Sequence, residues 1–349
     1  MSFYKSENYK KDIEISVKAV VGLEKLFNSS VLIAGGSGLI GSFIADMLLY
    51  ANKHMNANIT VYAMDLSAER LAARYEGSDT DKLHFVEHNV NELPDFEYQV
   101  DYIIHAASPA FPAAFNSDPV GTVMSNILGT KYLLDYGREH GTKRMLYISS
   151  GEVYGQGDLR LESFEESYAG YVDPTSARSC YPNGKRAAET LCVSYTKQFG
   201  LETVIVRPSH TYGPTVTKAD NRANAQFVNK GIAGEDIVLN SAGNQMRSYT
   251  YLADSASAIL SVLTSGESCN AYNIANSASR TTIAGFAKEV AIQTGTKVLF
   301  ADPDEVAKAE MTPIAKQVLS SSKLEDLGWK GQFTVEEGIR HTLDIMRDL

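Results

Sequence analysis

Short apolar runs alternate along the chain with longer segments in which apolar residues recur every three or four positions. The runs predict strands that are buried on both faces, and the periodic segments predict helices that cover them. The predicted strands are 30–34, 59–65, 83–90, 101–108 and 144–150, and the predicted helices are 42–50, 66–75, 120–139 and 181–199. This alternation is typical of an α/β protein with a doubly wound parallel sheet.

Two further regions flank the alternating part of the chain. Before the first strand, apolar residues predict a short amphipathic helix packed on the main body: Ile13, Val17, Val20, Val21 and Leu23. Beyond residue 214 the pattern predicts helices at 221–234, 248–265 and 282–294, strands at 237–239 and 271–274, and a closing amphipathic helix at 334–349. We therefore expect an N-terminal helical extension (1–29), a main sheet domain (30–208) and a second domain made mainly of 209–349, with segments that can interleave.

A glycine-rich turn joins the first predicted strand to the helix that follows it. Gly35, Gly38 and Gly41 follow one another at steps of three residues. Glycines allow the backbone to turn tightly and to approach a pyrophosphate, whose charge then lies at the N-terminal end of the helix. Strand, glycine turn and helix in this order predict a dinucleotide-binding site.

The ends of the next strands carry residues that suit the rest of a dinucleotide. Asp65 stands 24 residues after Gly41 and can accept hydrogen bonds from the adenosine ribose hydroxyls. A carboxylate there would repel a 2′-phosphate, so NAD is favoured over NADP. Asp65 also suits a helix cap, and it can serve as both. Asn89 can meet the adenine edge, and the small residues up to Ser108 let a cofactor lie against the backbone.

Tyr181 and Lys185 lie four residues apart, so they share one face of the helix predicted there. A phenol titrates near pH ~10 in water and is a poor base at neutral pH. A lysine ammonium group one turn away favours the phenolate, and a bound nicotinamide cation would favour it further. Such a tyrosine can take a proton from a sugar hydroxyl while the carbon beneath gives a hydride to the cofactor. The spacing alone also fits a solvated lysine beside a half-buried tyrosine, and the glycine turn is what favours the catalytic interpretation.

Composition and net charge argue against some classes of binding partner. The 349 residues are 44% hydrophobic and 21% charged, as in ordinary globular proteins, and the net charge of −10 argues against nucleic acid and against an anionic membrane surface. The three cysteines and seven histidines show no metal-ligand spacing, so we expect no metal site. The odd cysteine count, and an N-terminus without the apolar core of a signal peptide, favour a cytoplasmic location.

Five motifs, taken together and in order, resemble one family. They are the glycine turn, His105-Ala-Ala-Ser108, Asn126-Ile-Leu-Gly-Thr130, Ser149-Ser-Gly-Glu-Val-Tyr-Gly155 and Tyr181-x-x-x-Lys185. From about residue 31 to its C-terminus the chain resembles the extended short-chain dehydrogenase/reductases that act on nucleotide sugars. The resemblance implies a Rossmann-type domain that holds NAD, a smaller C-terminal α/β domain that binds a nucleotide-sugar substrate, and a homodimer formed through the helices that contain 126–139 and 181–199.

The resemblance also implies individual roles. Tyr181 and Lys185 match the family's base pair, Lys185 also holds the nicotinamide ribose, and Ser150 matches the group that hydrogen-bonds the sugar 4-hydroxyl. Arg247 matches an arginine that clamps the substrate diphosphate, and His210 stands at the domain crossover where many members have Asn. The implied NAD site consists of Gly35, Gly38, Leu39, Ile40, Gly41, Asp65, Asn89, Val90, Ala106, Ala107, Ser108, Asn126 and Lys185.

Glu152 bears on which reaction the family's shared 4-keto intermediate would undergo. Dehydratases and decarboxylases carry Glu at this place, where a carboxylate over C5 can move a proton, whereas many 4-epimerases have a neutral residue. The segments 108–120 and 165–191, which include Arg178 as a substrate-binding residue, are most similar to UDP-glucuronate decarboxylases. Three residues depart from that subfamily. Where this chain has Gly151, Phe115 and Gly121, the subfamily more often has Ser, Tyr and Lys, respectively.

Decarboxylation of UDP-glucuronate is therefore the first expectation, and three alternatives stay open. The chain can be a 4,6-dehydratase, although the missing Asp at Gly151 argues against loss of water from C6. It can be a nucleotide-sugar epimerase, because the departures at Phe115 and Gly121 argue against binding a uronate in the usual way. It can also be a non-catalytic NAD-binding sensor or scaffold, although such proteins typically lose the Tyr–Lys pair that is present here.

Overall fold

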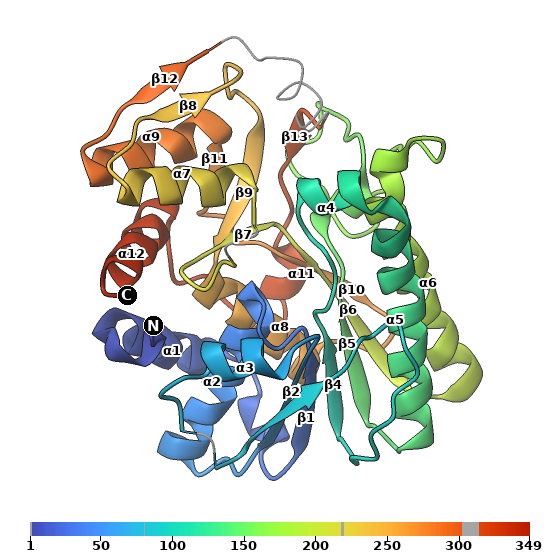
Figure 1. Cartoon of the computed structure of the whole chain (residues 1–349). Coiled ribbons are helices and arrows are strands. Elements are labelled where there is room, and N and C mark those ends of the chain that lie inside the picture. Colours follow the sequence, from blue (N-terminus) through green and yellow to red (C-terminus); the bar gives the residue numbers. More distant parts are fainter. Residues whose placement is uncertain (1, 80, 218–219, 302–313) are drawn as a thin grey trace.

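Seven parallel strands form the central sheet of the computed structural model, which describes residues 2–79, 81–217, 220–301 and 314–349 (Figure 1). The order across the sheet is β10-β6-β5-β4-β1-β2-β3, and every neighbouring pair is parallel. The strands are β1 (Ser30–Ala34), β2 (Thr60–Asp65), β3 (Leu83–Glu87), β4 (Tyr102–His105), β5 (Arg144–Ile148), β6 (Glu202–Pro208) and β10 (Ala271–Ile274). The predicted doubly wound parallel sheet is confirmed. Its strand order reverses between β1 and β4, which is the place where such sheets leave a ligand crevice at their carboxyl edge.

Helices cover both faces of this sheet. In β1, Val31 and Ile33 belong to one apolar cluster and Leu32 to another, because successive side chains of a strand alternate between faces. α2 and α8 pack on the first face, and α5 and α6 pack on the second (Figure 1). The helices of this part are α2 (Leu39–Met55), α3 (Ala68–Arg74), α4 (Pro112–Ser117), α5 (Pro119–Glu139), α6 (Cys180–Phe199) and α8 (Leu252–Ser265).

The chain beyond β6 builds a smaller part of the molecule, in the upper half of Figure 1. There β9 pairs with β7, β11 and β13, while β8 and β12 form a separate pair. The elements are β7 (His210–Tyr212), α7 (Ala223–Ile232), β8 (Ile237–Leu239), β9 (Met246–Tyr251), β11 (Arg280–Thr282), α9 (Ile283–Thr294), β12 (Val298–Phe300), β13 (Lys316–Gln317), α11 (Ser322–Glu325) and α12 (Val335–Arg347). Between them α8 and β10 return to the main sheet, so the two parts are interleaved.

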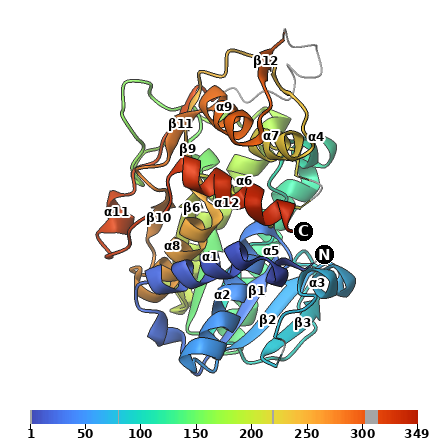
Figure 2. The same ribbon diagram turned by 90° about the vertical axis from the view of Figure 1, so that its left-hand side faces the viewer.

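The N-terminal helix α1 (Glu7–Ala19) packs against α2, α8 and α12, where the two parts of the molecule meet (Figure 2). Its carboxylate Asp12 is fully buried, accepts a hydrogen bond from the hydroxyl of Tyr251, and lies 2.6 Å from Nδ1 of His341. Two partners compensate the cost of burying that carboxylate and tie the start of the chain to its end. The predicted amphipathic N-terminal helix is confirmed for Ile13 and Val17. Val20 is its C-cap, and Val21 and Leu23 lie beyond it, Leu23 in the 3₁₀ turn η2 (Leu23–Leu26).

One predicted element is wrong in part. The sequence predicts a single helix over 248–265, but β9 occupies the residues up to Tyr251 and α8 begins at Leu252. Aromatic and β-branched residues favour a strand at Tyr249-Thr250-Tyr251. A strand buried on both faces and a buried helix are both continuously apolar, so periodicity does not separate them. The other predicted elements are present with ends shifted by a few residues; α2, for example, begins at Leu39 and runs to Met55.

Three further features of the described residues concern membrane-spanning helices, cysteines and metal ligands. Within the described ranges, no helix has the length and apolar character needed to span a bilayer. The three cysteines are free thiols. The same ranges contain no group of three or more His, Cys, Asp or Glu side chains arranged to hold a metal ion.

Candidate active site

A cavity of about 1350 Å³ lies between the carboxyl edge of the main sheet and the smaller part of the molecule. All but one of the residues predicted from the sequence to bind cofactor or substrate, or to act in catalysis, line it. They are Gly35, Gly38, Leu39, Ile40, Gly41, Asp65, Asn89, Val90, Ala106, Ala107, Ser108, Ser150, Glu152, Arg178, Tyr181, Lys185, His210 and Arg247. The fold thus brings together side chains from positions 35 to 247 of the sequence, because parallel strands end at one edge.

The glycine turn forms one end of this cavity and has the backbone that a pyrophosphate needs. Gly35 adopts φ +85°, and a Cβ there would lie 2.8 Å from the backbone of Ala106. A Cβ on Gly41 would lie 2.3 Å from the carbonyl oxygen of Gly35. Gly38 is the N-cap of α2 and supplies no side chain to the first amides of the helix, which are left to bind an anion. The turn therefore fits the diphosphate of a dinucleotide.

Asp65 ends β2 beside this turn. Its Oδ2 accepts hydrogen bonds from the backbone amide (3.1 Å) and the hydroxyl (2.6 Å) of Ser37, and its Oδ1 accepts one from the amide of Leu66 (2.8 Å). Arg70 Nη1 lies 3.5 Å from Oδ1. The predicted capping role falls to Ser67, whose hydroxyl accepts from an amide of α3. Asp65 thus lies in the cavity wall with its orientation fixed by the glycine turn, which fits an acceptor for the ribose hydroxyls.

Asn126 is the one predicted cofactor residue that does not line the cavity. It is fully buried in α5, its Nδ2 donates to the carbonyl of Thr122 (2.8 Å), and its Oδ1 accepts from the hydroxyl of Tyr147 (3.0 Å). Asn89 does line the cavity, and its side chain is held by Glu92 and by the amide of Asn91.

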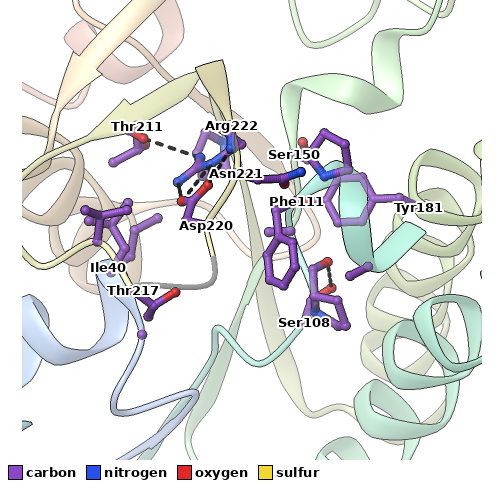
Figure 3. Close-up of a pocket in the computed structure, with 18 of the residues that line it drawn as sticks. Ile40, Ser108, Phe111, Ser150, Tyr181, Thr211, Thr217, Asp220, Asn221 and Arg222 are labelled. Atoms are coloured by element: carbon purple, nitrogen blue, oxygen red, sulfur yellow. Dashed lines mark hydrogen bonds and ion pairs between the residues drawn. The ribbon is translucent and has the colours of Figure 1, made fainter. Parts of the chain in front are cut away.

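Tyr181, Lys185 and Ser150 form a compact group at the junction of β5 and α6. Lys185 Nζ donates a hydrogen bond to the carbonyl oxygen of Ile148 (2.7 Å) and lies 5.6 Å from the centre of the Tyr181 ring. Ser150 follows β5, hydrogen-bonds the Tyr181 side chain, and stands beside it in the cavity wall (Figure 3). All three side chains therefore converge where a substrate hydroxyl can lie.

The protonation states of this group differ from the sequence-based expectation. Burial, together with the nearby charge of Glu152, raises the pKa of Tyr181 to about 12, although the hydrogen bond from Ser150 acts in the opposite direction. Burial also lowers the pKa of Lys185 to about 7, against the influence of Glu189. In the protein alone, therefore, the phenol is neutral at pH 7 and the lysine is only about half charged, because burial disfavours the charged form of each. A further positive charge, such as an oxidised nicotinamide ring carries, is needed to favour the phenolate.

Glu152 and Arg178 face each other beside the tyrosine. Arg178 Nη2 lies 3.2 Å from Glu152 Oε1, and Nη1 lies 3.3 Å from Oε2, so the pair is bidentate. The guanidinium also stacks 4.7 Å from the centre of the Phe115 ring, which in turn stacks on Tyr181 at 4.6 Å. The stacking fixes the carboxylate, the guanidinium and the phenol on one wall of the cavity.

Arg247 and His210 lie on the wall contributed by the smaller part. Arg247 is almost completely buried, and its guanidinium donates to the carbonyls of Met246 and Ile314. Its guanidinium has no carboxylate partner within the described ranges, so it can pair with an anion in the cavity. Burial, with the neighbouring Arg247 and Arg222, lowers the pKa of His210 to about 3, and Nδ1 of this neutral ring has no hydrogen-bond partner among the described residues.

Sequence reasoning missed other groups in the cavity wall. Arg222 pairs with Asp220 (2.5 Å) and donates to the carbonyl of Thr211, and all three lie in the same region of the cavity (Figure 3). Phe3, from the N-terminal extension, lines the cavity as well. An Asp–Arg pair two residues apart has no distinctive spacing, and a phenylalanine before the first strand carries no pattern, so neither could be found from the sequence.

Comparison with known proteins agrees with this geometry. Residues 31–275 match the NAD dependent epimerase/dehydratase family. UDP-glucuronic acid decarboxylase 6 of Arabidopsis thaliana is 32% identical over 316 residues, which cover 89% of this chain and 87% of that protein. UDP-glucuronic acid decarboxylase 1 of Xenopus tropicalis is 28% identical over 346 residues, which cover 98% and 78%.

Solved structures show the same fold. UDP-glucose 4-epimerase of Thermus thermophilus, in complex with NAD, superposes with a TM-score of 0.77 at 26% identity, covering 91% of this chain and 99% of that one. A dTDP-glucose 4,6-dehydratase of Streptomyces venezuelae has a TM-score of 0.77 at 23% identity, covering 91% and 97%. The glycine turn, Asp65 and the Tyr181 group fit NAD, which is the cofactor, and this enzyme belongs to the NAD-dependent epimerase/dehydratase family.

Proposed function

We propose that the protein decarboxylates UDP-glucuronate through a 4-keto sugar intermediate. The observation that carries the proposal is the position of the Glu152–Arg178 pair beside Tyr181 in one cavity wall. This arrangement provides a base for the sugar 4-hydroxyl next to a cation and a carboxylate for chemistry at C5 and C6. The two relatives described above, both UDP-glucuronic acid decarboxylases, support the choice of substrate.

The first step uses the group on β5 and α6. Tyr181 takes the proton of the 4-hydroxyl, while Ser150 hydrogen-bonds the same oxygen and Lys185 lies beneath the phenol. NAD held by the glycine turn and Asp65 would supply the acceptor for the C4 hydride and the donor that restores it. Lys185, held to the carbonyl of Ile148, also stands where a ribose hydroxyl of the cofactor can be bound.

The second step uses the 4-keto group, which makes the C6 carboxylate a leaving group. Arg178 is a cation with a planar fork that suits a carboxylate, and in the protein alone Glu152 occupies that fork. As the C5–C6 bond breaks, its electron pair passes into the enolate and carbon dioxide leaves. Glu152 lies where it can direct a proton to C5. Arg247 suits the substrate diphosphate, because it is buried and has no carboxylate partner within the described ranges.

A mass-spectrometric product assay tests the proposal. We expect UDP-glucuronate to lose carbon dioxide, and we expect no turnover of dTDP-glucose, GDP-mannose, CDP-glucose or UDP-N-acetylglucosamine. Loss of water from a hexose substrate, or an isomer of unchanged mass, would contradict decarboxylation. The Tyr181→Phe variant serves as the inactive control.

Epimerisation of a nucleotide sugar is the second candidate, and the wall near Gly121 favours it. A Cβ on Gly121 would lie 1.9 Å from Oδ2 of Asp118, whose Oδ1 caps α5 by accepting from the Gly121 amide (2.8 Å). At the position of Gly121, where decarboxylases often carry a lysine, this chain has a glycine beside the carboxylate of Asp118. This part of the cavity wall therefore lacks the lysine cation and presents a carboxylate, so it is less suited to binding the carboxylate of a uronate.

We also propose the predicted assembly, location and division of the chain. Val120 and Met124, one turn apart on α5, are 72% and 37% exposed, which supports a homodimer through α5 and the adjacent α6 (Figure 1). Light scattering of the purified protein tests the homodimer.

Three free thiols support a cytoplasmic location. We assign NAD binding to 30–208, nucleotide-sugar binding mainly to 209–349, and an accessory role to the extension 1–29.

A further inference from the structure

The N-terminal extension reaches the cofactor end of the cavity. Its 3₁₀ turn η1 (Phe3–Lys5) contacts α3, since Nη1 of Arg74 lies 3.4 Å from the hydroxyl of Tyr4, and the N-terminus lies beside α3 in Figure 2. Phe3 lines the cavity together with Asp65 and the glycine turn. Residues before 31 lie outside the match to the family, so this contact is a feature of this chain beyond the matched region.

Helix α3 joins the extension to the adenosine end of the site. Arg70, Ala73 and Arg74 line the cavity from one face of α3, since residues three and four apart are neighbours on a helix. Arg70 lies 3.5 Å from the carboxylate of Asp65, the acceptor placed for the adenosine ribose. Arg74 lies at the far end of this face, and its guanidinium carbon is 4.7 Å from the centre of the Phe3 ring. Phe3 thus packs on the same helix that carries Arg70 to the ribose site.

The position of Phe3 is fixed by a buried polar network. Arg74 Nη2 donates to Asp46 Oδ2 (2.6 Å) on α2 and to the hydroxyl of Tyr9 (2.7 Å) on α1. The hydroxyl of Tyr4 donates to Oδ1 of Asp46 (2.5 Å). Asp46 and Arg74 have side chains that are 1% and 7% exposed, so the pair is shielded from solvent. The network locks η1, α1 and α3 together and leaves the Phe3 ring at the cavity wall.

The same network is connected to the glycine turn. The hydroxyl of Tyr75, the residue after Arg74, donates to the carbonyl oxygen of Gly36 (2.7 Å). The Arg74 guanidinium carbon lies 5.2 Å from the Tyr75 ring centre. These contacts connect the extension, through α3, to the turn that fits the diphosphate.

We propose that Phe3 closes the adenosine end of the NAD site and that the N-terminal extension is a part of the cofactor-binding machinery. Phe3 covers the side of the adenosine pocket that Asp65 and α3 leave open, and the Arg74 network holds the ring there. An aromatic ring in this position excludes water and slows the release of the adenosine half of the dinucleotide. NAD is regenerated in each cycle of the proposed reaction, and slow release keeps it on the enzyme between turnovers. The inference rests on the cofactor of the family and is independent of which sugar is the substrate.

Equilibrium binding to the cofactor-free protein tests the inference without any assay of activity. In Phe3→Ala we expect the dissociation constants of NAD and AMP to rise about tenfold, since the ring no longer shields the adenosine from water. Nicotinamide mononucleotide and UDP should bind as they do to the unchanged protein, since neither occupies the adenosine pocket. Phe3→Trp should restore the affinity for NAD and AMP.

Val17→Ala is the matched control. Val17 is buried in α1 against the main body but does not line the cavity, so this variant loosens the extension without removing the ring. We expect it to lower thermal stability while leaving AMP affinity within about twofold. Unchanged NAD and AMP affinity in a folded Phe3→Ala variant would overturn the inference. So would equal losses for NAD, nicotinamide mononucleotide and UDP, which would indicate a general structural effect.

Discussion

Replacing Lys185 by Met should stabilise the cofactor-free protein at neutral and acid pH while abolishing its activity. Burial lowers the pKa of Lys185 from its ordinary value of 10.5 to about 7. Below pH 7 the folded protein therefore holds a charged ammonium in a site that disfavours the charge. The difference of about 3.5 between the two pKa values corresponds to a destabilisation of about 5 kcal/mol.

Part of this gain is lost with the lysine itself. The hydrogen bond from Nζ to the carbonyl of Ile148 disappears, and a buried carbonyl left without a partner costs about 1–3 kcal/mol. Glu189 keeps its ion pair with Arg207 (2.7 Å), so no new unpaired charge is created on that side. The net expectation is a stabilisation of about 2–4 kcal/mol at pH 6.

The stability difference between Lys185→Met and the unchanged protein should change with pH in one defined direction. Between pH 7 and 10.5 the unfolded chain binds more protons at Lys185 than the folded protein, so this group makes stability rise with pH in that window. In Lys185→Met this component is absent. The advantage of the variant should therefore shrink as pH rises and should reverse to a loss of about 1–3 kcal/mol near pH 10.5, where only the missing hydrogen bond remains.

Urea unfolding of the cofactor-free protein at pH 6, 8 and 10 measures the effect. Lys53→Met, at an exposed position on α2, is the control and should stay within about 0.5 kcal/mol at every pH. A Lys185→Met variant that is less stable at pH 6, or whose difference from the unchanged protein does not depend on pH, would refute the assignment of a desolvated, charged lysine.

Three further predictions concern the active site. Tyr181→Phe should abolish turnover of UDP-glucuronate but leave the dissociation constant of NAD within about threefold, because the lost hydroxyl is the base and makes no part of the glycine turn; calorimetry and the product assay check this. Glu152→Gln should reduce turnover by a factor of about 10² or more and should lower the pKa of Tyr181, seen as a shift of the pH–rate profile to lower pH; an unchanged profile would contradict the placement of its charge beside the phenol. Asp65→Asn should weaken NAD binding and reduce the preference for NAD over NADP about tenfold, as measured by binding of both dinucleotides, since the repulsion of a 2′-phosphate is removed.

Much of the fold and most of the predicted residues that line the candidate site could be found from the sequence because the relevant signals are local. The glycine turn, Asp65 and the Tyr181–Lys185 pair each follow or begin a predicted element, and parallel strands bring such positions to one edge. Asn126 shows the limit of this reasoning. It belongs to a motif of the family, but here its side chain bonds to Tyr147 and stays away from the cavity.

Protonation and long-range contacts could not be predicted in this way. The spacing of Tyr181 and Lys185 indicates mutual attraction, whereas their pKa values are set by burial that arises only in the folded molecule. The contact of Phe3 with Arg74 joins residues far apart in sequence and leaves no periodic trace. The strand at 246–251 could not be predicted either, since a strand buried on both faces is continuously apolar, like the buried helix that follows it.

The docking of α1 has a consequence for how the chain folds during synthesis. The helix leaves the ribosome long before α12, yet Asp12 bonds to His341 of α12, which lies 329 positions later. The apolar face of α1, with Ile13 and Val17, therefore stays without its full packing partners until α12 has been made. Contacts of such long sequence separation form slowly, so the nascent chain exposes this face to chaperones for most of its synthesis. A chain that terminates before α12 leaves Asp12 only partly paired, and the cell's proteases can recognise it by its undocked beginning rather than by its missing end.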